Sequence, residues 1–142
     1  MTLNRKIMSL FAATVVFTAG LATAAGPPET VHVTYHVQVG KLDEFLGVLK
    51  QHHPACLKLG LVLAEPHIIL SGKEDGEKPV VIEILTWKDS DAPDSVPGHQ
   101  PEIKKIWDKL NALVEKRGGK PGIEIEQMDI VTRTAQSKKA AP

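Results

Sequence analysis

The clearest hydrophobic pattern in the chain is a strict alternation of apolar and polar residues from position 31 to position 39. This alternation is typical of a half-buried β-strand, because successive side chains of a strand point to opposite faces. The apolar face of the predicted strand must contact helices. Its other face then directs His32 and His36 into a barrel or into a cleft between subunits.

Two later segments carry apolar residues at helical spacing. The first covers residues 42–53 and has two acidic residues in its first turn, where the helix dipole favours negative charge. Pro54 is expected to kink this helix or to begin a second short turn. The second helix begins near Glu102 and ends before Gly118-Gly119, and its apolar stripe comprises Ile103, Ile106, Trp107, Leu110, Leu113 and Val114.

Three further segments have strand character. Residues 61–70 contain Pro66, which indicates an edge strand or a bulge. Residues 80–87 are apolar enough for a central strand, and residues 123–132 form the last one. Residues 71–79 are predicted to be a turn and residues 88–101 a long Pro-rich loop.

The element order is therefore β-α-β-β-α-β, which predicts an α+β, ferredoxin-like fold. Such a fold has a four-stranded antiparallel sheet with both helices on one face. We expect Val81 and Leu85 on the opposite face, which has no cover within one chain. Because an exposed apolar sheet is an interaction surface, the pattern predicts a homodimer with sheet against sheet.

Residues 1–25 have the layout of a secretory signal peptide: Arg5 and Lys6, an uncharged run from position 7 to 21, and small residues at the exit. The run is shorter than the roughly 20 residues that span a bilayer, so a permanent membrane anchor is the weaker reading. We therefore predict an exported protein, periplasmic or secreted, with one domain at 26–133 and a disordered tail at 134–142.

Charge and cysteine content narrow the partners. Lys and Arg number 17, as do Asp and Glu, and no basic patch is evident, so nucleic acid is not an expected partner. Cys56 is the only cysteine, and the six histidines show no ligand spacing, so no metal site is predicted. His52 and His53 are explained by the preference for positive charge at a helix C-terminus.

Three segments together resemble the antibiotic biosynthesis monooxygenase superfamily, the dimeric α+β barrels. These are residues 39–46 at the start of the first helix, residues 83–89 at the end of the third strand, and His99 before the second helix. The resemblance implies a dimeric barrel related to cofactor-free oxygenases, haem-degrading enzymes and proteins without known activity. The family's haem degraders carry an Asn on the first strand, and none lies in residues 31–39, so haem is disfavoured and no cofactor is predicted.

The candidate site follows from strand faces and from this resemblance. Glu83 shares a face with Trp87, and if that face lines the barrel, it gathers His36, Glu83 and Trp87 around one cavity. His36 or His99 would be the base, since a histidine exchanges a proton near neutral pH. His32, Tyr35, Glu83 and Trp87 would contact the substrate. Alternatively, a His–carboxylate pair satisfies itself at an interface, and Trp87 covers the core.

The predicted function is binding of a small hydrophobic molecule in a cavity enclosed by the dimer, with cofactor-independent monooxygenation as the candidate reaction. Two alternatives remain open. The same fold can serve as a non-catalytic module that binds a ligand, or as a module that docks another protein, because fold does not determine function.

Overall fold

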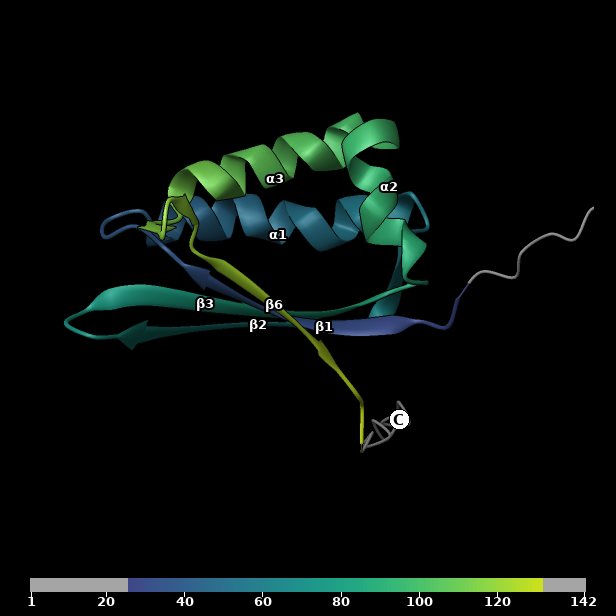
Figure 1. The fold of residues 1–142 in the computed structure, drawn as a ribbon, viewed down its shortest axis with the longest axis horizontal. Coiled ribbons are helices and arrows are strands. Elements are labelled where there is room, and N and C mark those ends of the chain that lie inside the picture. The colour runs from purple at the N-terminus through teal and green to yellow at the C-terminus, as the bar shows by residue number, and fades with distance from the viewer. Residues whose placement is uncertain (1–25, 132–142) are drawn as a thin grey trace, which may run out of the picture.

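The computed structural model describes residues 26–131, so the predicted leader and the C-terminal tail lie outside the described residues. A four-stranded antiparallel sheet has the order β2-β3-β1-β6, and α1 and α3 lie side by side over one face (Figure 1). This confirms the ferredoxin-like prediction. The elements are β1 (Glu29–His36), α1 (Leu42–Lys58), β2 (Val62–Glu74), β3 (Lys78–Trp87), α2 (Asp91–His99), α3 (Pro101–Leu113), β4 (Lys116–Arg117), β5 (Lys120–Pro121) and β6 (Ile123–Met128).

The helix-facing side of the sheet is built from every second residue of the two central strands. Cross-strand partners point to the same face, and Val31 pairs with Leu85 while Tyr35 pairs with Val81. All four residues are buried in the core. The expectation that Val81 and Leu85 line the uncovered face is therefore wrong, because the register places them with the apolar residues of β1.

The face without helices carries the alternate residues of each strand, those whose side chains point away from α1 and α3. Ile68 and Leu70 of β2 are 44% and 51% exposed there, and they pair with Ile84 and Ile82 of β3. Both isoleucines of β3 are half-buried. The predicted exposed apolar sheet surface thus exists, but with different residues.

Helix α1 continues through Pro54 to Lys58, so the predicted end near His53 and the separate short turn after it are wrong. Its buried residues continue past the proline at helical spacing: Phe45, Leu49, His52, His53 and Cys56. A proline in a helix interior costs about 3 kcal/mol. Burial of this continuous stripe against the sheet offsets that cost.

Strand β2 is the edge strand and contains a register shift between Val62 and His67, around the cis Glu65–Pro66 bond. Both readings of Pro66, edge and bulge, are confirmed. The predicted turn at 71–79 is shorter in the structure, because β2 continues to Glu74 and β3 begins at Lys78.

The segment predicted as a loop contains helix α2, despite Pro93 and Pro97. The Asp89 side chain explains its start, since Oδ1 accepts hydrogen bonds from the backbone N–H groups of Asp91 and Ala92. Ala92 and Val96 then bury one face of the helix. No helix among residues 26–131 is long and apolar enough to cross a membrane.

Candidate functional site

The carboxyl group of Glu83 is fully buried, with 0% exposure, in the layer between the sheet and the helices. Three donors surround it. Tyr35 donates from its hydroxyl to Oε2 at 3.1 Å, His52 lies with Nδ1 3.2 Å from both oxygens, and His67 has Nε2 3.2 Å from Oε1. A buried carboxylate is stable only with such partners.

The fold explains why these groups meet. Glu83 pairs with Val33 of β1, so Tyr35, two residues further along, points to the same face. On the other side β2 brings His67 opposite Leu85, again on that face. His52 lies on the buried stripe of α1, above the sheet.

The charge of Glu83 is set by these neighbours. Burial raises the pKa of this carboxyl group, but the hydrogen bonds from His52, His67 and Tyr35 and the charge on His52 lower it to about 2. The group is therefore a carboxylate at neutral pH. Burial and the nearby Glu83 raise the pKa of Tyr35 well above its ordinary value, so Tyr35 stays protonated and donates.

The other ring nitrogen of His52 accepts a hydrogen bond from Trp107, whose Nε1 lies 3.0 Å from Nε2. The indole N–H only donates, so this nitrogen carries no proton while the contact exists. The contact geometry corresponds to the neutral ring with its proton on Nδ1, facing Glu83.

Two influences on His52 therefore oppose each other. Burial lowers the pKa of its imidazole, but hydrogen bonds to Cys56 and Glu83 and the Glu83 charge raise it to about 10. Trp107 acts in the other direction, because the imidazolium would have no lone pair for its N–H. Nε2 is thus a strongly basic nitrogen whose present partner is a weak acid.

His53 adjoins this cluster through His67. His53 stacks on His67 with ring centroids 3.9 Å apart and planes 8° from parallel. Burial lowers the pKa of His53, while its Nε2 donates to the carbonyl oxygen of Leu63 at 3.0 Å. A neutral His53 can lie against His67 without charge repulsion.

A pocket of about 550 Å³ opens between α3 and the sheet, on the side of β6. That volume lies in the range of small-molecule sites. Its mouth includes Ile125, which is 68% exposed. Its mostly apolar wall comprises Glu29, Val31, Val33, Tyr35, His52, Leu85, Trp87, Pro93, Trp107, Leu110, Asn111, Lys120, Pro121, Ile123 and Ile125.

The structure brings together only part of the predicted site. Tyr35 and Trp87 line the pocket, and Glu83 lies behind its wall, bonded to His52. The expectation that His36, Glu83 and Trp87 share one cavity is wrong. His36 pairs with Val80 and Glu83 pairs with Val33, so the two side chains lie on opposite faces of the sheet.

The remaining predicted residues lie elsewhere. His32 shares the uncovered face with His36, and its nearest acidic neighbour is Glu126 on β6 at 3.9 Å. His99 is the last residue of α2 and is exposed. This pocket lies on the helix side of the sheet, whereas the sequence predicts a cavity between two sheets.

Sequence reasoning missed His52, His67 and Trp107. A signal for His52 was present, because it follows Phe45 and Leu49 on the apolar stripe and a polar residue there needs a buried partner. His67 carried no such signal, since the bulge at Pro66 determines which face it occupies.

No protein-family model matches the chain, and no curated protein matches it. Solved structures do. A mutant form of SnoaB, a cofactor-independent oxygenase from Streptomyces nogalater, superposes with a TM-score of 0.55 over 78% of this chain and 100% of that chain, at 19% identity.

Two other solved structures are similar. A conserved protein from Methanosarcina mazei gives a TM-score of 0.53 at 19% identity, covering 72% of this chain and 94% of the other. An antibiotic biosynthesis monooxygenase gives 0.51 at 18% identity, covering 73% and 99%. The chain thus has the fold of the antibiotic biosynthesis monooxygenase structures, an α+β ferredoxin-like domain.

Proposed function

We propose that the pocket beneath α3 binds a small, largely apolar molecule that presents an ionisable hydroxyl group to His52. The observation that carries this proposal is the placement of the His52 imidazole, bonded through Nδ1 to the buried Glu83, in the wall of an otherwise mostly apolar pocket. Glu83 on the far side of the ring holds the proton on Nδ1 and stabilises positive charge on the ring.

A ligand hydroxyl group would replace Trp107 as the partner of Nε2. If the hydroxyl group is acidic enough, its proton passes to His52 and the anion remains beside the imidazolium. If the ligand arrives as an anion, it binds an imidazolium that already exists. Both routes end in the same ion pair, which the buried Glu83 stabilises from behind.

Cofactor-independent oxygenation is the reaction that we propose for this complex, and it rests on similarity of fold to SnoaB. An anion of a polycyclic phenol or quinol is electron-rich enough to react with O₂ directly. When such a ligand carries an activated CH₂ group, that group and O₂ give a carbonyl group and water, so no external reductant is consumed. The second candidate is binding without turnover, which the same pocket supports.

Intrinsic fluorescence gives a direct test, because Trp87 and Trp107 are the only two tryptophans of the chain and both line the pocket. Titration with a dihydroxynaphthalene should quench this fluorescence to saturation. His52→Gln should weaken the binding, whereas His99→Gln, on the exposed end of α2, should not. Equal binding by both variants would exclude His52 from the site.

Oxygen uptake then separates the two candidates. An oxygen electrode should record consumption of O₂ with a polycyclic phenol, and His52→Gln should abolish it while binding persists more weakly. Saturable binding without O₂ consumption across a panel of such phenols would favour the module that binds without turnover.

The uncovered sheet face supports a second copy of the chain as the partner. Ile68 and Leu70 expose apolar surface there, beside Ile82 and Ile84, and a two-fold pairing of identical faces would bury all of it. We also propose export, on the pattern of residues 1–25. The intact mass of the protein purified from its host should lack about 25 N-terminal residues, as expected for a cleaved signal peptide.

A further inference from the structure

A second cluster of polar side chains lies at the end of β1, on the uncovered face of the sheet. His36 ends β1, and its side chain is only 6% exposed. Its backbone is held on both sides, since its N–H donates to Gly122 at 2.9 Å and its carbonyl oxygen accepts from Glu115 at 2.8 Å. The ring therefore has a defined position.

Both ring nitrogens of His36 face carboxylates. Nδ1 lies 2.7 Å from Oε1 of Glu74, and Nε2 lies 3.2 Å from Oε1 of Glu124. A neutral imidazole has one N–H and one lone pair, so it can satisfy only one of the two carboxylates. The other nitrogen then turns its lone pair toward a carboxylate, which is repulsive unless a cation lies between them or the ring gains a proton.

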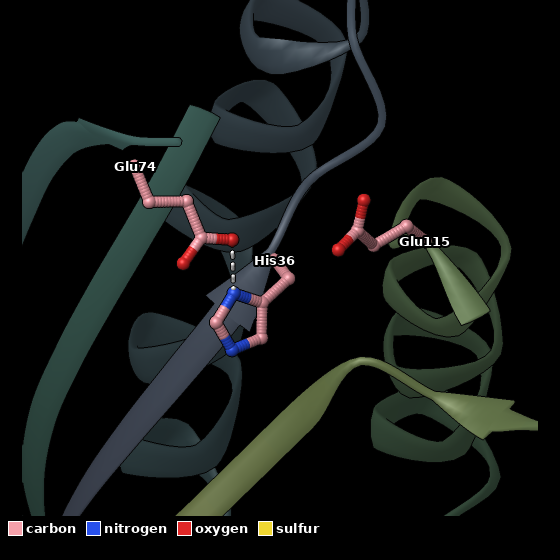
Figure 2. A group of neighbouring side chains, drawn as sticks. All are labelled: His36, Glu74 and Glu115. Atoms are coloured by element: carbon pink, nitrogen blue, oxygen red, sulfur yellow. Dashed lines mark hydrogen bonds and ion pairs between the residues drawn. The ribbon is translucent and has the colours of Figure 1, made fainter. Parts of the chain in front are cut away.

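A third carboxylate adjoins the same position. Figure 2 shows the carboxylates of Glu74 and Glu115 pointing toward His36 from two separate segments, one at the end of β2 and one after α3. One ligand atom from each of the three residues can be chosen so that all lie within 4.8 Å of one another. One imidazole nitrogen and two carboxylate oxygens form a ligand set that Zn²⁺ accepts, with water in the fourth position.

We propose that Nδ1 of His36 and the carboxylates of Glu74 and Glu115 form a binding site for a divalent transition metal, of which Zn²⁺ is the best match. Nε2 keeps its proton and donates to Glu124. A histidine that binds a metal through one nitrogen commonly donates from the other to a carboxylate, which fixes the tautomer. The Glu124 contact supplies that partner, independently of the three ligands.

The present cation at this position is Arg117. Its guanidinium group bonds to Glu74 and, through Nε at 2.8 Å, to Glu115. Lys78 lies further away, 4.0 Å from Glu115. Arg117 is 41% exposed on the short β4 strand, so it can turn into solvent when a metal arrives. Arg117 and the metal are then competitors for the same two carboxylates.

The bound metal would act as a cross-link. Its ligands come from positions 36, 74 and 115, so one ion would tie the ends of β1 and β2 to the segment that leaves α3. A group that binds the folded state alone stabilises it in proportion to the logarithm of its concentration over Kd. The expected consequence is structural and does not depend on the pocket.

Calorimetric titration of the purified, EDTA-treated protein with ZnCl₂ tests the proposal. One equivalent should bind, and Glu115→Gln should weaken the binding by about tenfold or more, since even the loss of a partner outside the ligand set typically costs about that much. Glu126→Gln is the matched control, because Glu126 lies on the same strand as Glu124 but outside the ligand set. Arg117→Ala should bind more tightly than the wild type, since the competing cation is gone.

Thermal unfolding provides the second readout. Zn²⁺ should raise the Tm of the wild type and leave the Tm of His36→Gln unchanged, with far-UV circular dichroism confirming that the variant is folded. Two results would overturn the proposal: no binding of one equivalent by wild type and Arg117→Ala alike, or equal affinity in wild type and Glu115→Gln.

Discussion

Glu83 illustrates how a single residue can have the right identity for a site and yet be assigned the wrong neighbours. Its side chain was expected beside His36 in a cavity between subunits. In the structure it bonds to Tyr35, His52 and His67 in the core. Because side chains alternate between the two faces of the sheet, Glu83 and His36 lie on opposite faces. The histidine nearest to the Glu83 carboxylate from the helix layer is His52 of α1.

The low pKa of Glu83 predicts acid sensitivity. Its pKa is about 2 in the folded protein and 4.5 as the ordinary value, so its stabilising effect is complete above pH 4.5 and is lost as pH falls toward 2. Each pKa unit corresponds to about 1.4 kcal/mol, which gives about 3 kcal/mol in total. Urea unfolding of the wild type at pH 5 and pH 2.5 should show most of this loss.

Glu83→Gln is the matching variant. It should be less stable than the wild type at pH 7 by about 3 kcal/mol, since charge-assisted bonds to a buried group are lost. It should also lose less stability on acidification, because the amide does not titrate. An unfolding free energy that falls as steeply in the variant as in the wild type would assign the acid sensitivity to other groups.

The balance at His52 gives a prediction about its pKa. Trp107→Phe removes a donor that needs an unprotonated Nε2, so the pKa of His52 should rise. Glu83→Gln removes the charge that raises it, so the pKa should fall. NMR titration of the imidazole carbon and nitrogen shifts measures both changes, with the His52 signal identified by its loss in His52→Gln. If the pKa of His52 moved in the same direction in both variants, Trp107 and Glu83 would not have opposite effects on this histidine.

At the scale of elements, the two prolines of α2 hid that helix, and the proline in α1 hid the last turn of a helix that the sequence otherwise predicts. Propensity favours a break at Pro54 and a loop around Pro93, yet the buried stripe of α1 and the Asp89 cap of α2 outweigh it. The strands were predicted better, because alternation reports burial directly. Strand ends were less accurate, since cross-strand hydrogen bonding extends β2 and β3 into a segment that reads as a turn.

Two glycines in different elements predict opposite effects of the same substitution. At Gly122, before β6, a Cβ would lie 2.8 Å from the backbone oxygen of Glu115, which cannot move because it accepts the Gly122 N–H. Gly122→Ala should cost about 1–3 kcal/mol as an overpacked site. At Gly47, on the exposed side of α1, a Cβ meets nothing within 4 Å, and alanine should add about 1 kcal/mol.

Chemical denaturation of the two glycine variants beside the wild type measures both effects. Gly47→Ala is the control for the general effect of losing glycine flexibility in the unfolded chain. If Gly122→Ala were as stable as Gly47→Ala, the close approach of the segments around Glu115 and Gly122 would not exist in solution.

At the scale of the whole molecule, the sheet has one face covered by α1 and α3 and one face bare (Figure 1). The bare face carries exposed isoleucine and leucine on β2 and acidic residues on β6. A single domain with such a surface is expected to associate.

Leu70→Glu tests the proposed dimer, because it places a charge in the centre of the apolar area on β2. Light scattering after gel filtration should give the mass of a dimer for the wild type and of a monomer for the variant. Lys50→Gln, on the exposed side of α1, lowers the charge by the same one unit and should leave the dimer intact. A wild-type protein that remains monomeric at micromolar concentration would exclude this pairing.

Some properties of this protein follow from the sequence alone. Alternation along β1 and helical spacing along α1 and α3 determine the element types and their order, and that order leads to the ferredoxin-like sheet. These signals are local, because burial of one face imposes a period of two or of about 3.6 residues on the chain. The bare apolar sheet face follows from the same element order, because the helices of this fold cover only one face of the sheet.

Only the tertiary structure decided which polar residues meet. Register between β1 and β3 put Glu83 among the helices and His36 on the other face, and the shift at Pro66 turned His67 toward Glu83. The contacts of His52 with Trp107, and of His36 with Glu74 and Glu115, join residues 38 or more positions apart. No local period encodes such distances, since each depends on the packing of several elements at once.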